Sequence, residues 1–168
     1  MSVTAPSSPQ LIARLAVGPL DPQIDEFPPT AEATGAAGAT VEFWGIVREW
    51  EDPTHVCGPA QGNHGDDRDH SASDSPVSLE PFRIAALDYE AHPEMAQHQL
   101  ERVARDVAAR NGLLALYVLH RTGRVPVGDA SLYIRIHSAH RGEALRACAE
   151  FIDELKRWVP IWKHPERA

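Results

Sequence analysis

Two lysines near the end of the chain are the residues best suited by type and spacing to do chemistry. Lys156 and Lys163 bracket an apolar, aromatic stretch that contains one proline. The hydrophobic residues before Lys156 recur at helical spacing; they are Leu145, Cys148, Ala149, Ile152 and Leu155. At about 100° per residue, Lys156 is expected to project within the same stripe. Because a charged amine is costly to bury, we expect a lysine there to be kept for its chemistry. A lysine that snorkels from the edge of the stripe remains an alternative.

Three further basic residues are candidates for binding an anion. Arg48 follows a strand pattern, and His140 and Arg141 begin the helix that leads to Lys156. Free N–H groups at a helix start favour phosphate or carboxylate. Lys156 lies at the other end of that helix, roughly 20 Å away at 1.5 Å per residue. A symmetric dimer could bring the start of this helix in one copy close to its end in the other. The alternative interpretation is that these basic residues are solvated surface residues without a ligand.

Bulk composition limits the class of protein. The 168 residues suit one domain, 1–168, with a sizeable core. The net charge of −8 argues against general nucleic-acid binding, and no apolar run approaches the roughly 20 residues of a membrane span. The start of the chain has no signal-peptide pattern, and Cys57 and Cys148 form no CxxC pair. We therefore expect a cytoplasmic protein that acts without a membrane or a disulfide framework.

Residues 51–78 differ in kind from the rest of the chain. They are rich in Asp, His, Ser, Gly and Pro and poor in large apolar residues, which predicts a flexible insert. Potential metal ligands gather there: His55, Cys57, His64, Asp66, Asp67, Asp69 and His70. Their spacing matches no regular zinc module, so we expect no metal and no cofactor. A metal-binding function through this insert is one alternative.

Hydrophobic patterning predicts the elements that must position the candidate residues. Strands are predicted at 11–17, 39–47, 82–89, 113–120 and 130–138. Other predicted features are a short helix or two within 21–37, a helix from Pro93 to the stop at Asn111 and Gly112, a turn-rich connector at 121–129, and a helix from a cap at Ser138 to Lys156. In the last strand Leu132, Ile134 and Ile136 are expected to point inward, and Tyr133, Arg135 and His137 outward. This order predicts an α+β fold, with helices packed on a mixed or antiparallel sheet.

Five segments in the same order resemble the large, catalytic subunit of molybdopterin synthase, the MoaE family. They are FWGIVR (43–48), LDYEAHPEMA (87–96), HRTGRVPVGD (120–129), SAHR (138–141), and FIDELK with PIWK (151–156 and 160–163). The resemblance extends over about 11–163 apart from the insert.

The resemblance implies an α/β-hammerhead-type fold and a sulfurtransferase of molybdenum cofactor biosynthesis. Such an enzyme converts cyclic pyranopterin monophosphate (precursor Z) into molybdopterin by building its dithiolene. The sulfur comes from a thiocarboxylate on the C-terminal Gly-Gly of a small ubiquitin-like subunit, MoaD. The family forms a homodimer within a heterotetramer, with one small subunit at each end. A non-catalytic module that binds a ubiquitin-like tail is the alternative function.

The resemblance also implies roles for individual residues. Lys156 and Lys163 fall on the two active-site lysines, and we hypothesise that Lys156 is the main catalytic group while Lys163 assists and orients the tail. The other positions implied to bind substrate are Ile46, Val47 and Arg48 at the strand end, His140 and Arg141 from across the dimer, and His164 and Pro165 beyond the second lysine. The departures from the family are the long insert and the short segment after Lys163.

Overall fold

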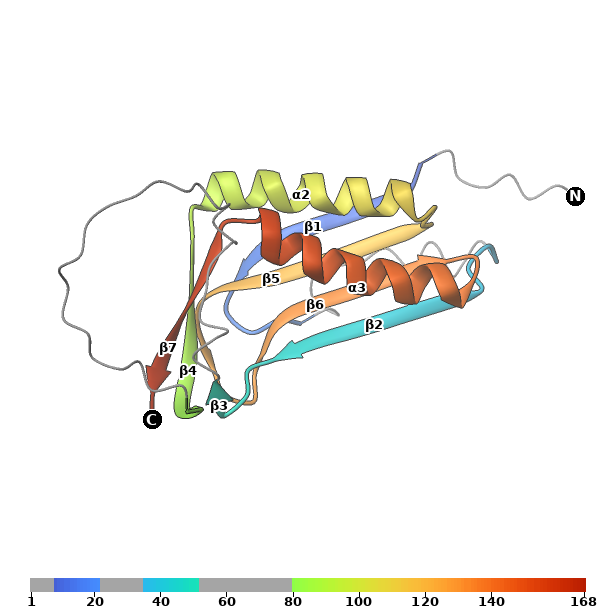
Figure 1. Ribbon diagram of the computed structural model, residues 1–168. Helices are drawn as coiled ribbons and strands as arrows, with labels where there is room; N and C mark the ends of the chain where they lie inside the picture. The colour runs from blue at the N-terminus through green and yellow to red at the C-terminus, as the bar shows by residue number, and fades with distance from the viewer. Residues whose placement is uncertain (1–7, 22–34, 52–79) are drawn as a thin grey trace, which may run out of the picture.

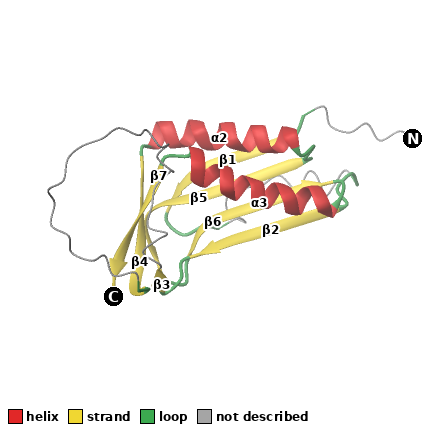
Figure 2. Ribbon diagram, viewed as in Figure 1, coloured by secondary structure: helices red, strands yellow, loops and turns green. Residues whose placement is uncertain are grey.

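The computed structural model describes residues 8–21, 35–51 and 80–168. Its strands are β1 (Gln10–Val17), β2 (Ala39–Ile46), β3 (Trp50–Glu51), β4 (Phe82–Ala91), β5 (Ala115–Pro126), β6 (Ala130–Ser138) and β7 (Ile161–Arg167), and its helices are α2 (Pro93–Arg110) and α3 (Arg141–Trp158). Both helices lie over one face of a mixed sheet (Figures 1 and 2). This confirms the predicted α+β class. The helix predicted within 21–37 and the insert predicted at 51–78 lie almost wholly outside the described residues.

Strand β5 is the central strand of the sheet. Its first part pairs in parallel with β1 and antiparallel with β6, and its last residues pair with β4. On the edge of β5 opposite β6, the pairing partner changes from β1 to β4 at Gly123. This glycine has φ +77° and pairs with Tyr89. The predicted connector at 121–129 is therefore wrong, because β5 continues to Pro126. Pairing with a distant strand overrides the local turn signals of glycine and proline.

The main core lies between the helices and the sheet. It includes Leu100, Val107, Leu116, Ile134, Ile136 and Phe151, so the inward residues of β6 are as predicted. A second cluster, made by Ala115, Tyr117, Leu119 and Tyr133, covers the opposite face. Tyr133 and His137 lie on this opposite face, as their predicted outward orientation requires, but both are buried there rather than exposed. The Tyr133 hydroxyl donates to Glu42 Oε1 at 3.2 Å, and His137 Nδ1 bonds to the hydroxyl of Thr40, so both buried polar groups have partners.

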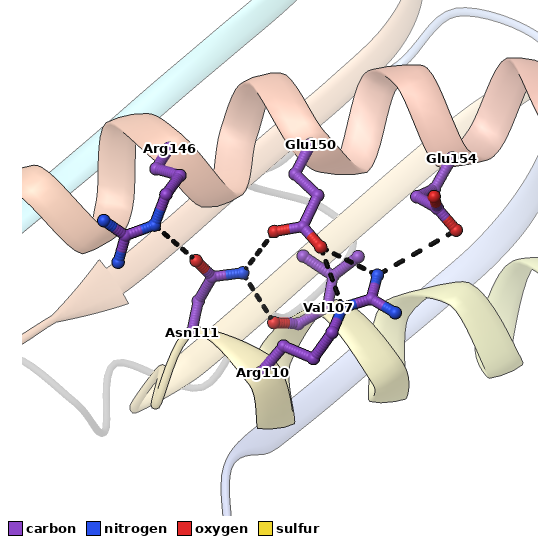
Figure 3. Close-up of polar contacts among 6 residues, drawn as sticks. All are labelled: Val107, Arg110, Asn111, Arg146, Glu150 and Glu154. Carbon is purple, nitrogen blue, oxygen red and sulfur yellow. Dashed lines mark hydrogen bonds and ion pairs between the residues drawn. The ribbon is translucent and has the colours of Figure 1, made fainter.

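A polar network ties the end of α2 to the middle of α3 (Figure 3). The Nδ2 of the buried Asn111 donates to Val107 O at 3.1 Å and to Glu150 Oε2 at 2.6 Å. Its Oδ1 accepts from Arg146 Nε at 3.0 Å, and Arg110 Nε donates to Glu150 Oε1 at 2.8 Å. Asn111, at the predicted end of the helix, therefore also joins α2 to α3, because its one side-chain amide bonds to groups on both helices.

Strands β3, β4 and β7 form a smaller arm at the end of the sheet where α3 finishes (Figure 1). Strand β7 runs antiparallel to β4, and Glu51 of β3 pairs with Phe82 on the other edge of β4. Neither β3 nor β7 was predicted. In the described part of the chain β7 pairs only with β4, and an edge strand tolerates the missing N–H of Pro165. Neither described helix is long and apolar enough to cross a membrane.

Candidate active site

Lys156 is exposed in the last turn of α3. The buried stripe of this helix comprises Ala144, Ala147, Cys148, Phe151 and Leu155. Leu145, which helped to define the predicted stripe, is 58% exposed. The prediction that Lys156 lies within the stripe is therefore wrong, because the true stripe is centred on small alanines one position away. The amine instead lies at the helix C-terminus, where a cation is favoured by the helix dipole.

Lys163 and Arg48 both face one buried carboxylate. Lys163 Nζ lies 2.8 Å from Glu51 Oε2, although the two residues are 112 positions apart in sequence. The side chain of Glu51 is only 4% exposed, and its Oε1 lies 4.0 Å from Arg48 Nη2. We call Arg48, Glu51 and Lys163 the carboxylate cluster. It leaves the Arg48 side chain 69% exposed, so the guanidinium remains open to a ligand.

Backbone bonds hold Arg48 at the end of β2. Val47 is buried, donates its N–H to Asp129 O at 3.0 Å, and accepts from Gly128 N at 2.9 Å. Ile46, just before it, is half exposed. The β5–β6 turn therefore fixes the start of the segment that carries Arg48.

Two polar aromatic rings, those of Tyr89 and His120, lie beside the carboxylate cluster. Tyr89 is directly opposite Lys163 in the β4–β7 pairing, and its hydroxyl donates to Ser131 Oγ at 3.1 Å. Burial raises the pKa of Tyr89, the hydrogen bond to Ser131 opposes this, and the charge of Glu51 raises it further. His120 packs edge-on against the Tyr89 ring, and burial lowers its pKa to about 4 against a backbone bond that raises it. Both rings are therefore uncharged near neutral pH.

His140 and Arg141 lie at the far end of α3 from the carboxylate cluster (Figure 1). Both are exposed, and the helix cap is His140, whose N–H donates to Glu143 Oε2 at 3.1 Å. The predicted cap at Ser138 is wrong, because the Ser138 hydroxyl donates to the carbonyl of His140. One chain therefore does not bring this pair to Lys163.

The residues after Lys163 alternate between the two faces of β7. Pro165 shares the face of Lys163, whereas His164 points to the other side, where its Nε2 lies 3.1 Å from Glu90 Oε2. The structure thus separates His164 from the carboxylate cluster.

Sequence analysis missed Glu51 as a functional candidate. It was assigned to the insert, because a two-residue strand gives too short an alternation to recognise. The sequence carries no signal for it, because the burial of Glu51 beside an exposed Trp50 is seen only in the structure. Among the described residues no group of three or more potential ligands could hold a metal, and the His- and Asp-rich stretch at 55–70 lies outside them.

Several solved structures share the fold of this chain. A crystal structure of molybdopterin synthase from Staphylococcus aureus superposes with a TM-score of 0.64 over 93% of this chain and 91% of that chain, at 23% identity. A protein–protein complex of subunits 1 and 2 of molybdopterin-converting factor from Helicobacter pylori has a chain with a TM-score of 0.55, at 22% identity over 93% of this chain and 82% of that one. These likenesses show that the fold is that of the molybdopterin synthase proteins.

Sequence comparison makes the assignment specific. The family model described as "MoaE protein" matches residues 70–158, and the chain belongs to the MoaE family. The molybdopterin synthase catalytic subunit of Oryza sativa subsp. indica is 43% identical over 86 residues, which cover 51% of this chain and 45% of the relative. The human catalytic subunit is 38% identical over 86 residues, covering 51% and 46%. The chain thus spans about half the length of the curated relatives it matches.

Proposed function

We propose that this chain is the catalytic subunit of a molybdopterin synthase. It would transfer sulfur from the thiocarboxylated C-terminus of a small ubiquitin-like subunit to precursor Z. The observation that carries the proposal is the convergence of Arg48 and Lys163 on the buried Glu51, in a chain of the MoaE family. A similar structure from Helicobacter pylori is a complex of subunits 1 and 2 of molybdopterin-converting factor, which supports a small-subunit partner.

The chemistry of the cluster suits this reaction. Precursor Z carries a cyclic phosphate, for which the open guanidinium of Arg48 is a suitable receptor. Attack by a thiocarboxylate passes through species with developing negative charge, which a fixed ammonium at Lys163 stabilises. Lys156 is the main catalytic amine in this scheme, and the incoming tail covers its exposed position and excludes water from it.

The sulfur would come from the partner rather than from Cys148, which is the cysteine among the described residues; Cys57 lies outside them. Cys148 is buried in the core, and burial raises the pKa of its thiol. A thiol with a raised pKa is a poor nucleophile because little of it is thiolate. This supports transfer from a thiocarboxylate on the partner.

The two ends of α3 make a second copy of the chain necessary for a complete site. His140 and Arg141 would bind the phosphate of a substrate held in the site of the partner copy. Free N–H groups at a helix start and a guanidinium both favour anions. A homodimer with one small subunit at each end would supply this arrangement.

Reconstitution tests the proposal. Purified chain, thiocarboxylated small subunit and precursor Z are mixed, and molybdopterin is measured over time. We expect product with the wild-type chain and a large loss with Lys156→Ala. Binding of the small subunit without product would indicate the non-catalytic alternative, and undiminished product with Lys156→Ala would remove that lysine from the mechanism.

A further inference from the structure

We infer that Glu51 is a positioning residue that holds the Lys163 amine and the Arg48 guanidinium in fixed relation to each other. The inference rests on the proposed function and adds a residue to it. Glu51 contacts Lys163 through Oε2 at 2.8 Å and approaches Arg48 through Oε1 at 4.0 Å. One oxygen of the carboxylate therefore bonds to Lys163, and the other lies near Arg48 at a distance longer than a hydrogen bond.

Strand β4 is the common template for this geometry. Glu51 pairs with Phe82 on one edge of β4, and Lys163 pairs with Tyr89 on the other. The N–H of Ile84 also donates to Glu49 O at 2.9 Å, which fixes the approach to β3. Backbone pairing therefore anchors both segments to the same strand, and the ion pair between their side chains completes the contact.

Stability alone does not explain a buried carboxylate at this position. Replacing a buried ion pair by apolar residues is often neutral or stabilising, because desolvation offsets the attraction. Exposed pairs already tie each of these segments to a neighbouring strand: Arg83 of β4 binds Glu49 just before β3, and Arg124 of β5 binds Glu166 of β7. The strands of the arm are thus attached by other contacts, and the buried pair adds the placement of the Lys163 amine near Arg48.

The placement matters for the chemistry of the amine. An ammonium has three N–H donors, and the contact with Glu51 uses one of them, which leaves two for a ligand. Lys163 is 24% exposed, so its amine is reachable although its stem is packed. A donor that is oriented before substrate arrives needs no reorganisation in the transition state.

The test uses the fact that the chain contains only two lysines, Lys156 and Lys163. Glu51→Gln removes the charge and keeps the size, and Glu49→Gln is the matched control from the same segment. Amine acylation is followed at each lysine by mass spectrometry, with Lys156 as the internal reference. We expect acylation of Lys163 relative to Lys156 to rise several-fold in Glu51→Gln only, because the carboxylate no longer covers the amine.

Single-turnover kinetics of the reconstituted synthase supply the second measurement. We expect Glu51→Gln to lower the rate constant roughly 10- to 100-fold, as for a misplaced catalytic group. The small-subunit concentration that gives half of the maximal rate should change little. Glu49→Gln should match wild type. A wild-type rate in Glu51→Gln together with unchanged acylation of Lys163 would overturn the inference.

Glu51→Asp guards against a folding defect in the first variant. It retains the buried charge but withdraws the carboxylate by one methylene, so a positioning role predicts a partial loss of rate. A wild-type rate in this variant would overturn the inference as well. If the wild-type chain itself forms no product, the proposed function fails, and the acylation ratio still decides whether Glu51 holds Lys163.

Discussion

Tyr89 and Lys163 lie directly opposite each other where β4 pairs with β7, so their side chains share one face of the sheet. The Tyr89 hydroxyl is turned to Ser131, which in turn donates to Gly45 O at 3.2 Å. A chain of hydrogen bonds therefore joins β4, β6 and the end of β2 beside the amine.

Tyr89→Phe tests this chain of hydrogen bonds. The variant keeps the ring against His120 and removes one buried bond, so we expect about 0.5–1.5 kcal/mol of lost stability. The measurement is chemical denaturation. Ser131→Ala should cost a similar amount, and the double variant less than the sum. Strict additivity would show that the two hydroxyls do not interact.

Asn111→Ala should loosen the contact between α2 and α3. It removes an amide that bonds to both helices and leaves Glu150 and Arg146 short of a buried partner. We expect a loss of about 1–3 kcal/mol in the free energy of unfolding, measured by urea denaturation. Glu154→Gln, which alters only a looser 3.9 Å pair with Arg110, is the control and should cost less than about 0.5 kcal/mol. Equal losses in both variants would contradict this account.

His120 makes stability depend on pH. Burial lowers its folded-state pKa from 6.5 to about 4, so the unfolded chain binds the proton more tightly. Stability from this group is therefore complete above about pH 6.5 and is lost as the pH falls to about 4, by roughly 3 kcal/mol. Denaturation at a series of pH values measures the slope. His120→Phe should flatten it between these values, and an unchanged slope would assign the effect to other groups.

Gln97 covers the outer edge of β1. Its amide accepts from Leu15 N at 2.9 Å and donates to Ala13 O at 2.7 Å, as a neighbouring strand would. Because an uncovered edge can pair with another chain, Gln97→Leu should promote self-association at high concentration. Sedimentation velocity would detect the larger species. His98→Leu, at the exposed neighbouring position, is the control. Equal association of the two variants would indicate non-specific hydrophobic association instead of edge pairing.

The sequence predicted those elements whose signals are local. Helix α2 begins at Pro93 and stops at Asn111 and Gly112, where φ of the glycine is +59°, because the proline, the periodicity and the left-handed glycine are all encoded nearby. The MoaE family was recognised from ordered motifs and is confirmed by the family match.

Features that depend on a distant partner were missed. Strand β7 forms along the edge of β4, about seventy residues earlier, and its own residues include a proline. Glu51 becomes a site candidate only when β3 and β7 meet on β4. The error on Lys156 has another cause: alanines define the buried stripe of α3, and they are weaker signals than the exposed Leu145. The roles of the individual site residues stay predictions.

The length of α3 has a genetic consequence. If His140 and Arg141 serve the site of the partner copy, Arg141→Ala and Lys163→Ala damage different halves of each shared site. Each variant alone would then be inactive, yet a mixture would complement. Random pairing makes half of the dimers hybrids with one intact site out of two, which restores about a quarter of the wild-type number of sites. Two inactive alleles in one cell would thus yield molybdopterin, an outcome that a site built from one copy forbids.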